Sequence, residues 1–429
     1  MPSLVALGLT LVALVAAPAQ DVKPLGAKET QDAVARYLAL DGRKESERAE
    51  QRKLLGRLAL AKELAPIDVK SWREKMFKDL AKRGRQLEQK PGAQWFWPAE
   101  SKGGADRGFF IVGGEMKKPK ALMIGMHGGG VGSGDAWTAH GSMDGAAKEL
   151  GWLAIYPEVL EKTERGWTDS GSEEFVLDLV EAALATWKLD RDRVFFSGHS
   201  MGGYGTWLLG AHHADLVAGL APSAGAPTPV FDRAGKVIDI DHGVIPSLRN
   251  VPIRIYQSDD DPNVPPDANR AAAKLLENAR ERWGGFDFEY WEVPNRQHGA
   301  APGGFAALLA KLADLERVAR PTKVVWQPIL AWKRQFYWLY WETPKAHATV
   351  VAEIDRAKNE VRVTCDRDAS GLSVLLDETL VDLSKDVTVY LGDTAVFHGK
   401  PKRELATLLL SAARNDPKLA YSARVVLAP

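Results

Sequence analysis

The residues with the clearest chemical potential lie in the pentapeptide 198–202, which reads Gly-His-Ser-Met-Gly. A strand-like apolar run over 194–197 precedes this pentapeptide, and an apolar, helix-like stretch follows it. A G-x-S-x-G motif in that context is typical of a nucleophile elbow, a sharp turn that lifts a serine hydroxyl clear of a sheet. Gly198 and Gly202 are small enough to let strand and helix pass closely at such a turn. Ser200 is therefore the candidate nucleophile.

A serine hydroxyl reacts well only when a base removes its proton, and a carboxylate must orient that base. His298 is the candidate base, because it directly follows a predicted strand over 290–293 and because it comes last in the order Ser, Asp, His. The rival histidines lie inside the elbow, along the following helix, or before the candidate acids; they are His199, His212, His213 and His242.

The candidate acid lies in a run of three consecutive aspartates that follows the predicted strand 253–257. Loops at the carboxyl edge of a parallel sheet gather around the ligand crevice, which is where such an acid is needed. Chemistry alone does not distinguish Asp261 from Asp259 and Asp260, since the latter two are equally suited to capping the turn.

The negative charge that develops on a carbonyl oxygen during attack needs N–H donors that are already in place. The backbone N–H of Met201, the residue after the nucleophile, is one expected donor. We expect the second donor in the glycine-rich run that follows the predicted strand 121–126, with Gly129 favoured and Gly128 and Gly130 as alternatives. A plain flexible turn is the other interpretation of this run. A phosphate cradle is disfavoured, because the Lys-Ser/Thr of a P-loop is missing.

Four segments are predicted along the chain. They are a signal peptide over 1–19, a charged helical segment over 20–93, a catalytic domain over 94–320 and a β-rich accessory domain over 325–429. The leader is apolar over 4–16 and ends in Ala-Pro-Ala, a small-x-small cleavage pattern, although no Lys or Arg precedes its apolar part. This pattern predicts a secreted or periplasmic protein with no stable membrane insertion after cleavage.

The catalytic segment alternates strand-like and helix-like runs, which indicates a mostly parallel sheet covered on both faces. Its predicted strands are 109–112, 121–126, 152–156, 194–197, 251–257 and 286–293. The third segment is mostly strand-like, with runs at 337–341, 349–354, 360–364, 372–376, 387–391 and 423–427 and one helix over 404–414. The predicted fold class is thus α/β, with a sandwich-like β domain attached. The sequence leaves open whether the N-terminal helices cap the active site, pack behind it or bind a partner.

Composition excludes several classes of function. The chain has 56 basic and 56 acidic residues, so no strong electrostatic surface for nucleic acid is expected. No metal-binding spacing is present, and neither a metal nor another cofactor is expected. Cys365 is the only cysteine, so no intrachain disulfide can form, and its place in an apolar alternation predicts a buried strand thiol. The aromatic runs 95–97 and 336–341 favour packing over a carbohydrate platform.

The stretch 198–207, Gly-His-Ser-Met-Gly-Gly-Tyr-Gly-Thr-Trp, resembles the elbow of the α/β-hydrolase superfamily. Within that superfamily it is similar to a secreted serine esterase branch with polyhydroxybutyrate-depolymerase-like, feruloyl-esterase-like and phospholipase/carboxylesterase-like members, as is the preceding run 189–194. The acid of this family commonly opens a D-x-x-V-P stretch, which 261–265 matches, so the resemblance selects Asp261. The family histidine sits in a loop before a final helix, as His298 does before 305–318. The resemblance covers the middle half of the chain.

The resemblance implies hydrolysis of a carboxylic ester through an acyl-serine. The expected substrates are acyl or feruloyl esters linked to polysaccharide, or a polyester. A prolyl-oligopeptidase-like serine peptidase shares the fold and the residue order, but such enzymes usually carry a large propeller domain that this sequence does not predict. The remaining alternative is a non-catalytic glycan-binding protein, in which the β domain binds and the hydrolase core is a scaffold.

Overall fold

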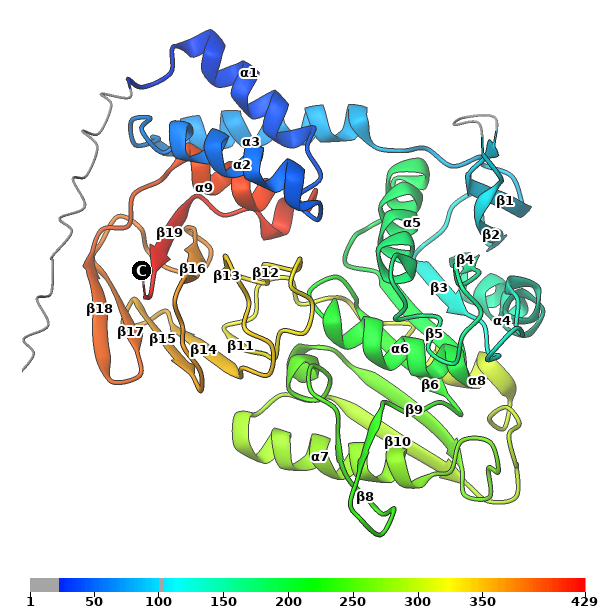
Figure 1. Ribbon diagram of the computed structural model, residues 1–429. Coiled ribbons are helices and arrows are strands. Elements are labelled where there is room, and N and C mark those ends of the chain that lie inside the picture. Colours follow the sequence, from blue (N-terminus) through cyan, green and yellow to red (C-terminus); the bar gives the residue numbers. More distant parts are fainter. Residues whose placement is uncertain (1–22, 100–103, 429) are drawn as a thin grey trace, which may run out of the picture.

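The computed structural model describes residues 23–99 and 104–428 (Figure 1). The predicted signal peptide over 1–19 lies outside the described residues. The helices are α1 Ala27–Leu38, α2 Glu45–Leu58, α3 Pro66–Arg83, α4 Ala136–Leu150, α5 Ser172–Trp187, α6 Met201–His212, α7 Asp267–Trp283, α8 Gly304–Ala310 and α9 Leu405–Ala412. None of the helices in this part of the chain is both long and apolar enough to cross a membrane.

The largest sheet in the described part of the chain has eight strands in the order β1-β2-β4-β3-β5-β6-β9-β10. These strands are β1 Gly92–Trp97, β2 Arg107–Gly114, β3 Leu122–Met126, β4 Leu153–Pro157, β5 Val194–His199, β6 Gly219–Ser223, β9 Ile253–Ser258 and β10 Phe288–Val293. β1 and β2 are antiparallel to their neighbours, and every other pairing in the sheet is parallel. A small hairpin, β7 Pro229–Phe231 with β8 Val237–Ile240, follows β6.

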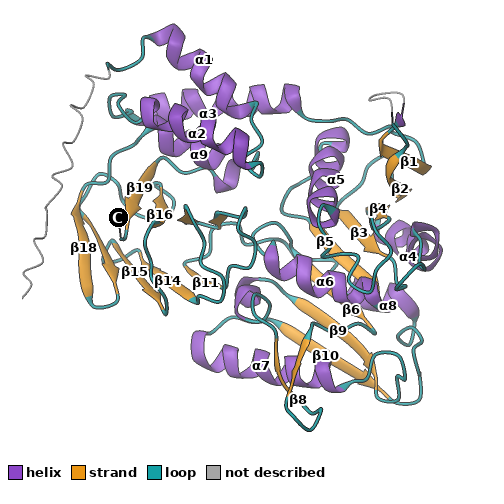
Figure 2. Ribbon diagram, in the orientation of Figure 1, coloured by secondary structure: helices purple, strands orange, loops and turns teal. Residues whose placement is uncertain are grey.

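Alternate residues of the central strands enter two separate cores, because side chains along a strand point to opposite faces. Leu122 and Ile124 of β3 belong to the core that contains α5, α6 and α7, whereas Met123 belongs to the core that contains α4 and α8. Figure 2 shows helices on both sides of the strands. The sequence prediction of a mostly parallel sheet covered on both faces is therefore confirmed.

The C-terminal segment forms two smaller sheets. The first contains β11 Lys323–Trp326, β14 Val350–Asp355, β15 Glu360–Cys365, β17 Val387–Leu391 and β18 Thr394–Gly399. The second contains β12 Gln335–Phe336, β13 Leu339–Trp341, β16 Leu372–Leu376 and β19 Ala423–Val426. The ring of Trp326 in the first sheet stacks on Phe336 of the second at 5.5 Å, so the two sheets contact each other. The β-rich character predicted for this segment is confirmed.

Two details of this segment differ from the sequence prediction. Of the strand predicted over 337–341, only residues 339–341 are extended, as β13, because Tyr337 has a φ of 50° and lies in the turn that joins β12 to β13. Cys365 ends β15 and is half-buried rather than fully buried, and this partial burial raises the pKa of its thiol. The aromatic run 336–341 is buried in the core, as expected for packing, whereas Trp95 of the other run stays exposed.

The N-terminal helices share a core with the C-terminal helix α9. Val34 and Tyr37 of α1 and Met76 of α3 lie in one buried cluster with Leu408 and Leu409 of α9. Figure 1 shows α1, α2, α3 and α9 as one group, on the far side of the molecule from β1 and β2. The two ends of the chain thus build one helical unit. Arg43 of this unit contacts Asp178 of α5, and Arg414, just after α9, contacts Asp215, just after α6. The unit therefore packs at the end of α6 that is remote from Ser200, rather than over the serine.

Candidate active site

Ser200 occupies the turn between β5 and α6 in a backbone conformation that is costly for any residue other than glycine. Its φ is 59° and its ψ is −123°, and its N–H donates to the carbonyl oxygen of Ser223 at 2.9 Å. A Cβ added at Gly198 would lie 2.4 Å from the backbone of Gly202, and one added at Gly202 would lie 2.1 Å from the oxygen of Met126. Only glycine therefore fits at both positions, and the turn has the geometry that the sequence predicted for a nucleophile elbow.

The structure brings Ser200, His298 and Asp261 into one chain of hydrogen bonds. Ser200 Oγ lies 2.9 Å from His298 Nε2, and His298 Nδ1 lies 2.8 Å from Asp261 Oδ2. The carboxylate can only accept, so Nδ1–H donates to Asp261 and leaves Nε2 free to accept from the serine hydroxyl. The His298 side chain is 21% exposed and that of Asp261 is 0% exposed, so the network opens to solvent only at the serine and histidine.

Asp261 is fixed by the backbone of its own loop. Its Oδ1 accepts from the N–H groups of Asn263 and Val264, both at 2.9 Å. These two bonds leave Oδ2 directed at His298. A buried carboxylate with that many donors keeps its orientation, which is what an imidazole partner needs.

The two other aspartates of the run bind the backbone of the histidine loop instead of the imidazole. Asp260 Oδ1 accepts from the N–H groups of Arg296 at 3.1 Å and Gln297 at 2.7 Å, and these bonds help to lower its pKa after the larger effect of a hydrogen bond from Ser258. Asp259 Oδ1 accepts from the N–H of Asn295 at 3.2 Å. Both aspartates therefore position the loop that carries His298.

His199 supports His298 from the opposite side, a role that the sequence analysis did not assign. Its Nε2 lies 3.1 Å from the carbonyl oxygen of His298, and its Nδ1 lies 3.1 Å from Ser223 Oγ. Burial and the nearby His298 ring lower the pKa of His199, so the neutral ring donates through Nε2 and accepts from the serine through Nδ1. The position of His199 next to Ser200 in the sequence hinted at a role in the site. Its partner, the carbonyl oxygen of His298, is visible only in the folded structure.

The glycine-rich run after β3 passes directly beside the nucleophile. A Cβ added at Gly128 would lie 3.1 Å from Ser200 Cβ. His127 Nδ1–H donates to the carbonyl oxygen of Gly128 at 2.8 Å, while its Nε2 accepts from the N–H of Val159 at 3.2 Å. These two bonds require the neutral ring, and burial lowers the pKa of His127 accordingly.

Within this run, Gly129 and Gly130 differ in how their backbone groups are hydrogen-bonded. Gly129 has a φ of 139°, and its N–H finds no hydrogen-bond acceptor within residues 23–99 and 104–428. Gly130 forms a β-bridge with Ser133, whose N–H donates to the Gly130 oxygen at 3.1 Å. Because a trans peptide directs its C=O and N–H to opposite sides, the bond from His127 to the Gly128 oxygen fixes the direction of the Gly129 N–H. Met201, the other predicted donor, is the first residue of α6.

The remaining histidine candidates lie elsewhere. His212 and His213 are at the other end of α6, where their rings lie 2.9 Å and 2.7 Å from Oε1 of the buried Glu173. His242 packs against His347 with ring centroids 4.7 Å apart. In the described part of the chain, no cluster of His, Cys, Asp or Glu is arranged to hold a metal ion.

The fold and this site together define the class of the protein. A mostly parallel sheet with the serine on a strand-to-helix turn, followed in chain order by an aspartate and a histidine at the same edge, is an α/β-hydrolase fold. The fold that the sequence resemblance implied is therefore present.

Comparisons with known proteins give matches to solved structures over part of this chain. No protein-family description and no curated protein matches the chain. Among solved structures, a thermostable esterase is 18% identical with a TM-score of 0.38, and the match covers 49% of this chain and 60% of the esterase. This chain therefore spans less than two thirds of the length of that esterase.

Two further esterases are matched over most of their length. Est1E from Butyrivibrio proteoclasticus is 16% identical with a TM-score of 0.33, and the match covers 44% of this chain and 86% of Est1E. The CE1 ferulic acid esterase AmCE1/Fae1A from Anaeromyces mucronatus, solved with ferulic acid, is 16% identical with a TM-score of 0.36. That match covers 54% of this chain and 94% of the fungal enzyme.

Proposed function

We propose that the protein is a serine hydrolase that cleaves carboxylic esters through an acyl-serine intermediate. The observation that carries this proposal is the hydrogen-bonded chain from Ser200 Oγ through the His298 ring to Asp261, with distances of 2.9 Å and 2.8 Å. These contacts are within the range needed for proton transfer between a nucleophile and its base. The serine end of the chain is open to solvent, so a substrate can reach it.

In the proposed mechanism, Ser200 Oγ attacks the ester carbonyl carbon while its proton moves to His298 Nε2. The N–H groups of Met201 and Gly129 donate to the resulting oxyanion. The tetrahedral intermediate then breaks its bond to the alcohol oxygen, which leaves with the proton from His298. Water repeats the attack on the acyl-serine with His298 as base, and the acid product and free Ser200 result. Asp261 holds the imidazole tautomer and stabilises the imidazolium that forms twice in the cycle.

We also propose a bulky acyl or aryl ester, carried on a polysaccharide or in a polyester, as the substrate class. Ser200 and His298 are half-exposed rather than enclosed. Two large apolar side chains near the glycine-rich run are exposed, Val131 at 75% and Trp137 at 52%. Exposed apolar groups that follow this run in the chain suit contact with a large substrate. The apolar leader supports the further proposal that the protein acts outside the cytoplasm.

Labelling and turnover test the proposal together. The full chain, its Ser200→Ala variant and a surface control, Ser142→Ala, are incubated with a fluorophosphonate probe and with 4-nitrophenyl acetate. The parent and the control should label and turn over equally. The Ser200→Ala protein should not label and should lose about 10⁴–10⁶-fold in kcat.

Two outcomes would contradict the proposal. Aryl-ester turnover that persists in a folded Ser200→Ala protein would rule out the acyl-serine mechanism. A folded parent protein that neither labels nor turns over would favour a binding protein on a hydrolase scaffold. A panel of short peptides is run in parallel, because faster cleavage of peptides than of esters would identify a peptidase with the same three residues.

A further inference from the structure

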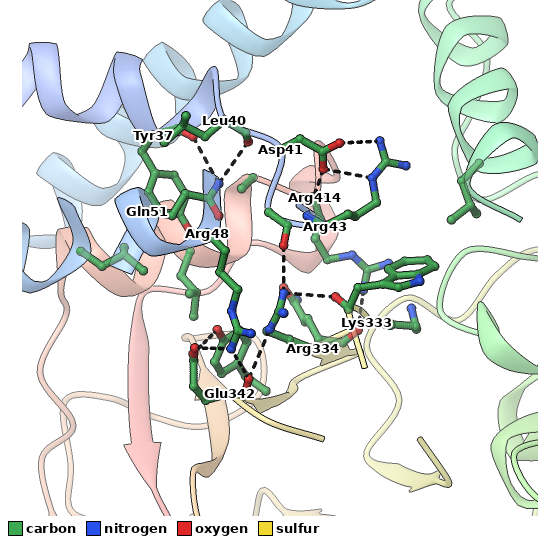
Figure 3. A pocket seen from close by; sticks show the side chains of 18 of the residues that line it. Tyr37, Leu40, Asp41, Arg43, Arg48, Gln51, Lys333, Arg334, Glu342 and Arg414 are labelled. Atoms are coloured by element: carbon green, nitrogen blue, oxygen red, sulfur yellow. Dashed lines mark hydrogen bonds and ion pairs between the residues drawn. The ribbon is translucent and has the colours of Figure 1, made fainter. Parts of the chain in front are cut away.

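A cavity lies at the opposite end of α6 from Ser200, where the helical unit, the α/β domain and the β-rich segment meet (Figure 3). Its volume is about 360 Å³, which is in the range of small-molecule sites. The turn between α1 and α2, helix α5, the residues after α6, the segment 332–342 and α9 all contribute to its wall. Twelve helical residues separate it from Ser200, or roughly 18 Å along the axis of α6, so it is not part of the ester site.

The wall of this cavity carries more positive than negative side chains. The basic ones are Arg43, Arg48, Arg52, Lys333, Arg334 and Arg414. The acidic ones are Asp41, Asp178, Glu181 and Glu342. Charges in a partly enclosed site are costly unless they are paired. A cation of this wall that has no carboxylate partner is therefore a candidate to bind an anion.

Most of the cations have a carboxylate partner. Arg43 lies 3.0 Å from both Asp41 and Asp178. Lys333 and Arg414 share the buried carboxylate of Asp215, which lies just behind the wall.

The cations of α2 are also paired. Arg48 lies 2.7 Å from Glu342 and 3.1 Å from Glu45. Arg52 lies 3.0 Å from Glu45. Among residues 23–99 and 104–428, these pairs leave one guanidinium of the wall without an ion pair to a carboxylate.

That guanidinium belongs to Arg334, which bonds only to backbone oxygens. It donates to the carbonyl oxygens of Gly42 at 3.0 Å, Glu342 at 3.2 Å and Trp332 at 3.4 Å. Its Nη2 has no hydrogen bond to any residue of 23–99 or 104–428, and Figure 3 shows the side chain amid the labelled residues of the site. Burial, together with the neighbouring charge of Arg48, lowers its pKa, and the nearby carboxylates of Glu342 and Glu45 only partly oppose this effect.

Arg48, a neighbouring cation of the wall, also has a nitrogen without a partner among the described residues, although that atom does not face the cavity. Arg48 Nε is buried and has no hydrogen-bond partner in the described part of the chain. Tyr37 and Trp332 supply aromatic surface elsewhere in the same wall. The cavity therefore combines an unmatched positive charge with an apolar side, which is the complement of an amphipathic anion.

We propose that this cavity binds a small organic anion whose carboxylate or phosphate group is held by Arg334, with its apolar body against Tyr37 and Trp332. Arg334 provides Nη2 as a donor without giving up its bonds to the backbone. Separate segments of the chain build the wall of this cavity, so the cavity exists only in the folded protein. The anion therefore binds the folded protein and not the unfolded chain. Binding should therefore raise the melting temperature as the ligand concentration rises.

The test uses two anions and a neutral analogue on the full chain. Phenyl phosphate, benzoate and benzyl alcohol are titrated by calorimetry into the parent protein and into two cavity variants. Arg334→Gln removes the unmatched charge. Ala413→Glu places a negative charge in the wall at an exposed residue, so it leaves the packing and the backbone bonds of Arg334 in place. Arg270→Gln is the matched control, since Arg270 is exposed and lies on α7 outside the cavity.

At least one anion should bind the parent and the Arg270→Gln control, and both cavity variants should weaken that binding by roughly tenfold or more. A preference for phenyl phosphate assigns a phosphate ligand, and a preference for benzoate assigns a carboxylate. The proposal fails if neither anion binds at up to about 10 mM, or if benzyl alcohol binds as tightly as the anions. It fails equally if folded Ala413→Glu protein binds the anions as tightly as the parent does.

Discussion

The two ends of helix α6 carry polar networks that are built differently. At its N-terminal end, Ser200 and the partly exposed His298 form a chain with one buried carboxylate, Asp261. Beyond its C-terminal end, the carboxylate of Asp215 is 0% exposed and binds the side chains of Lys333 and Arg414. The first network is open at one end, whereas the carboxylate of the second is surrounded by donors.

The difference shows what each network can do. A network that exchanges protons with a substrate needs a member with a free lone pair at the surface, and the serine–histidine pair provides it. A buried and satisfied network cannot exchange protons easily, but it fixes geometry, and breaking it leaves uncompensated charge. We therefore expect changes at the Ser200 end to affect rates, and changes at the Asp215 end to affect stability.

The largest expected effect in this comparison is that of Asp261→Asn on the rate. Without the carboxylate, the imidazole loses its tautomer and the partner of its positive charge, and kcat for 4-nitrophenyl acetate should fall about 10⁴-fold. Asp260→Ala, which only loosens the histidine loop, should cost up to about 10²-fold. Steady-state kinetics on both folded variants measure this contrast. Equal losses would show that the aspartate run acts as a unit, and would remove the distinction between orienting acid and loop support.

Asp215→Asn should lower the free energy of unfolding by about 3–5 kcal/mol, because Lys333 and Arg414 would be left as buried cations without a full counter-charge. Urea denaturation measures this change. Asp287→Asn is the control, since that carboxylate is 58% exposed and pairs with Arg254 at the surface, where such pairs contribute at most about 1 kcal/mol. Activity per folded molecule should stay near that of the parent. A large loss of kcat without a loss of stability would reverse the roles assigned to the two ends of α6.

Gly129→Ala should lower kcat by about 10²–10³-fold, the loss typical of one oxyanion donor. Its φ of 139° does not suit alanine, and the added Cβ would lie 2.5 Å from the oxygen of Ser133, so the loop must shift. Gly130→Ala is a matched control, because a Cβ there has no atom within 4 Å. It should leave kcat nearly unchanged. The opposite ranking of the two variants would assign the donor to Gly130 instead.

The smallest expected effect is a pH dependence at the Asp215 end. Burial lowers the pKa of His213 to about 4, against an ordinary value near 6.5. The unfolded chain therefore binds this proton more readily, so the contribution of His213 to stability is complete above pH 6.5. It is lost as the pH falls from 6.5 to about 4, and amounts to at most about 3 kcal/mol. Urea denaturation at several pH values across this range gives the free energy of unfolding as a function of pH. This free energy should fall less steeply with decreasing pH in His213→Gln than in the parent. An unchanged dependence on pH would exclude His213 as the cause.

Much of the geometry of the candidate site could be predicted from the sequence, because its local requirements are visible in residue types. Gly198 and Gly202 are needed for the turn, and a serine between them has few other uses. The choice among Asp259, Asp260 and Asp261 was different, since adjacent carboxylates are chemically alike. Only the path of the loop shows that one faces the imidazole while the others bind backbone N–H groups.

The parts that could not be predicted depend on contacts between distant segments. Strand β6, Gly219–Ser223, has a poor sequence for a strand, with glycine and proline, and it exists because β5 and β9 pair with it on either side. Strand β18, Thr394–Gly399, is half-exposed and shows little apolar alternation. The apolar side of the N-terminal helices was visible as a pattern, but its partner α9 lies more than 300 residues away.

The shared core of α1, α2, α3 and α9 has a consequence for biosynthesis. The first helices leave the ribosome early, yet the surface that covers them, in α9, is among the last to be made. At ordinary rates of translation, the delay between the end of α2 and the end of α9 is roughly 20–70 s. During that interval the nascent chain presents uncovered apolar helices, so its N-terminal region is the natural client for a holding chaperone.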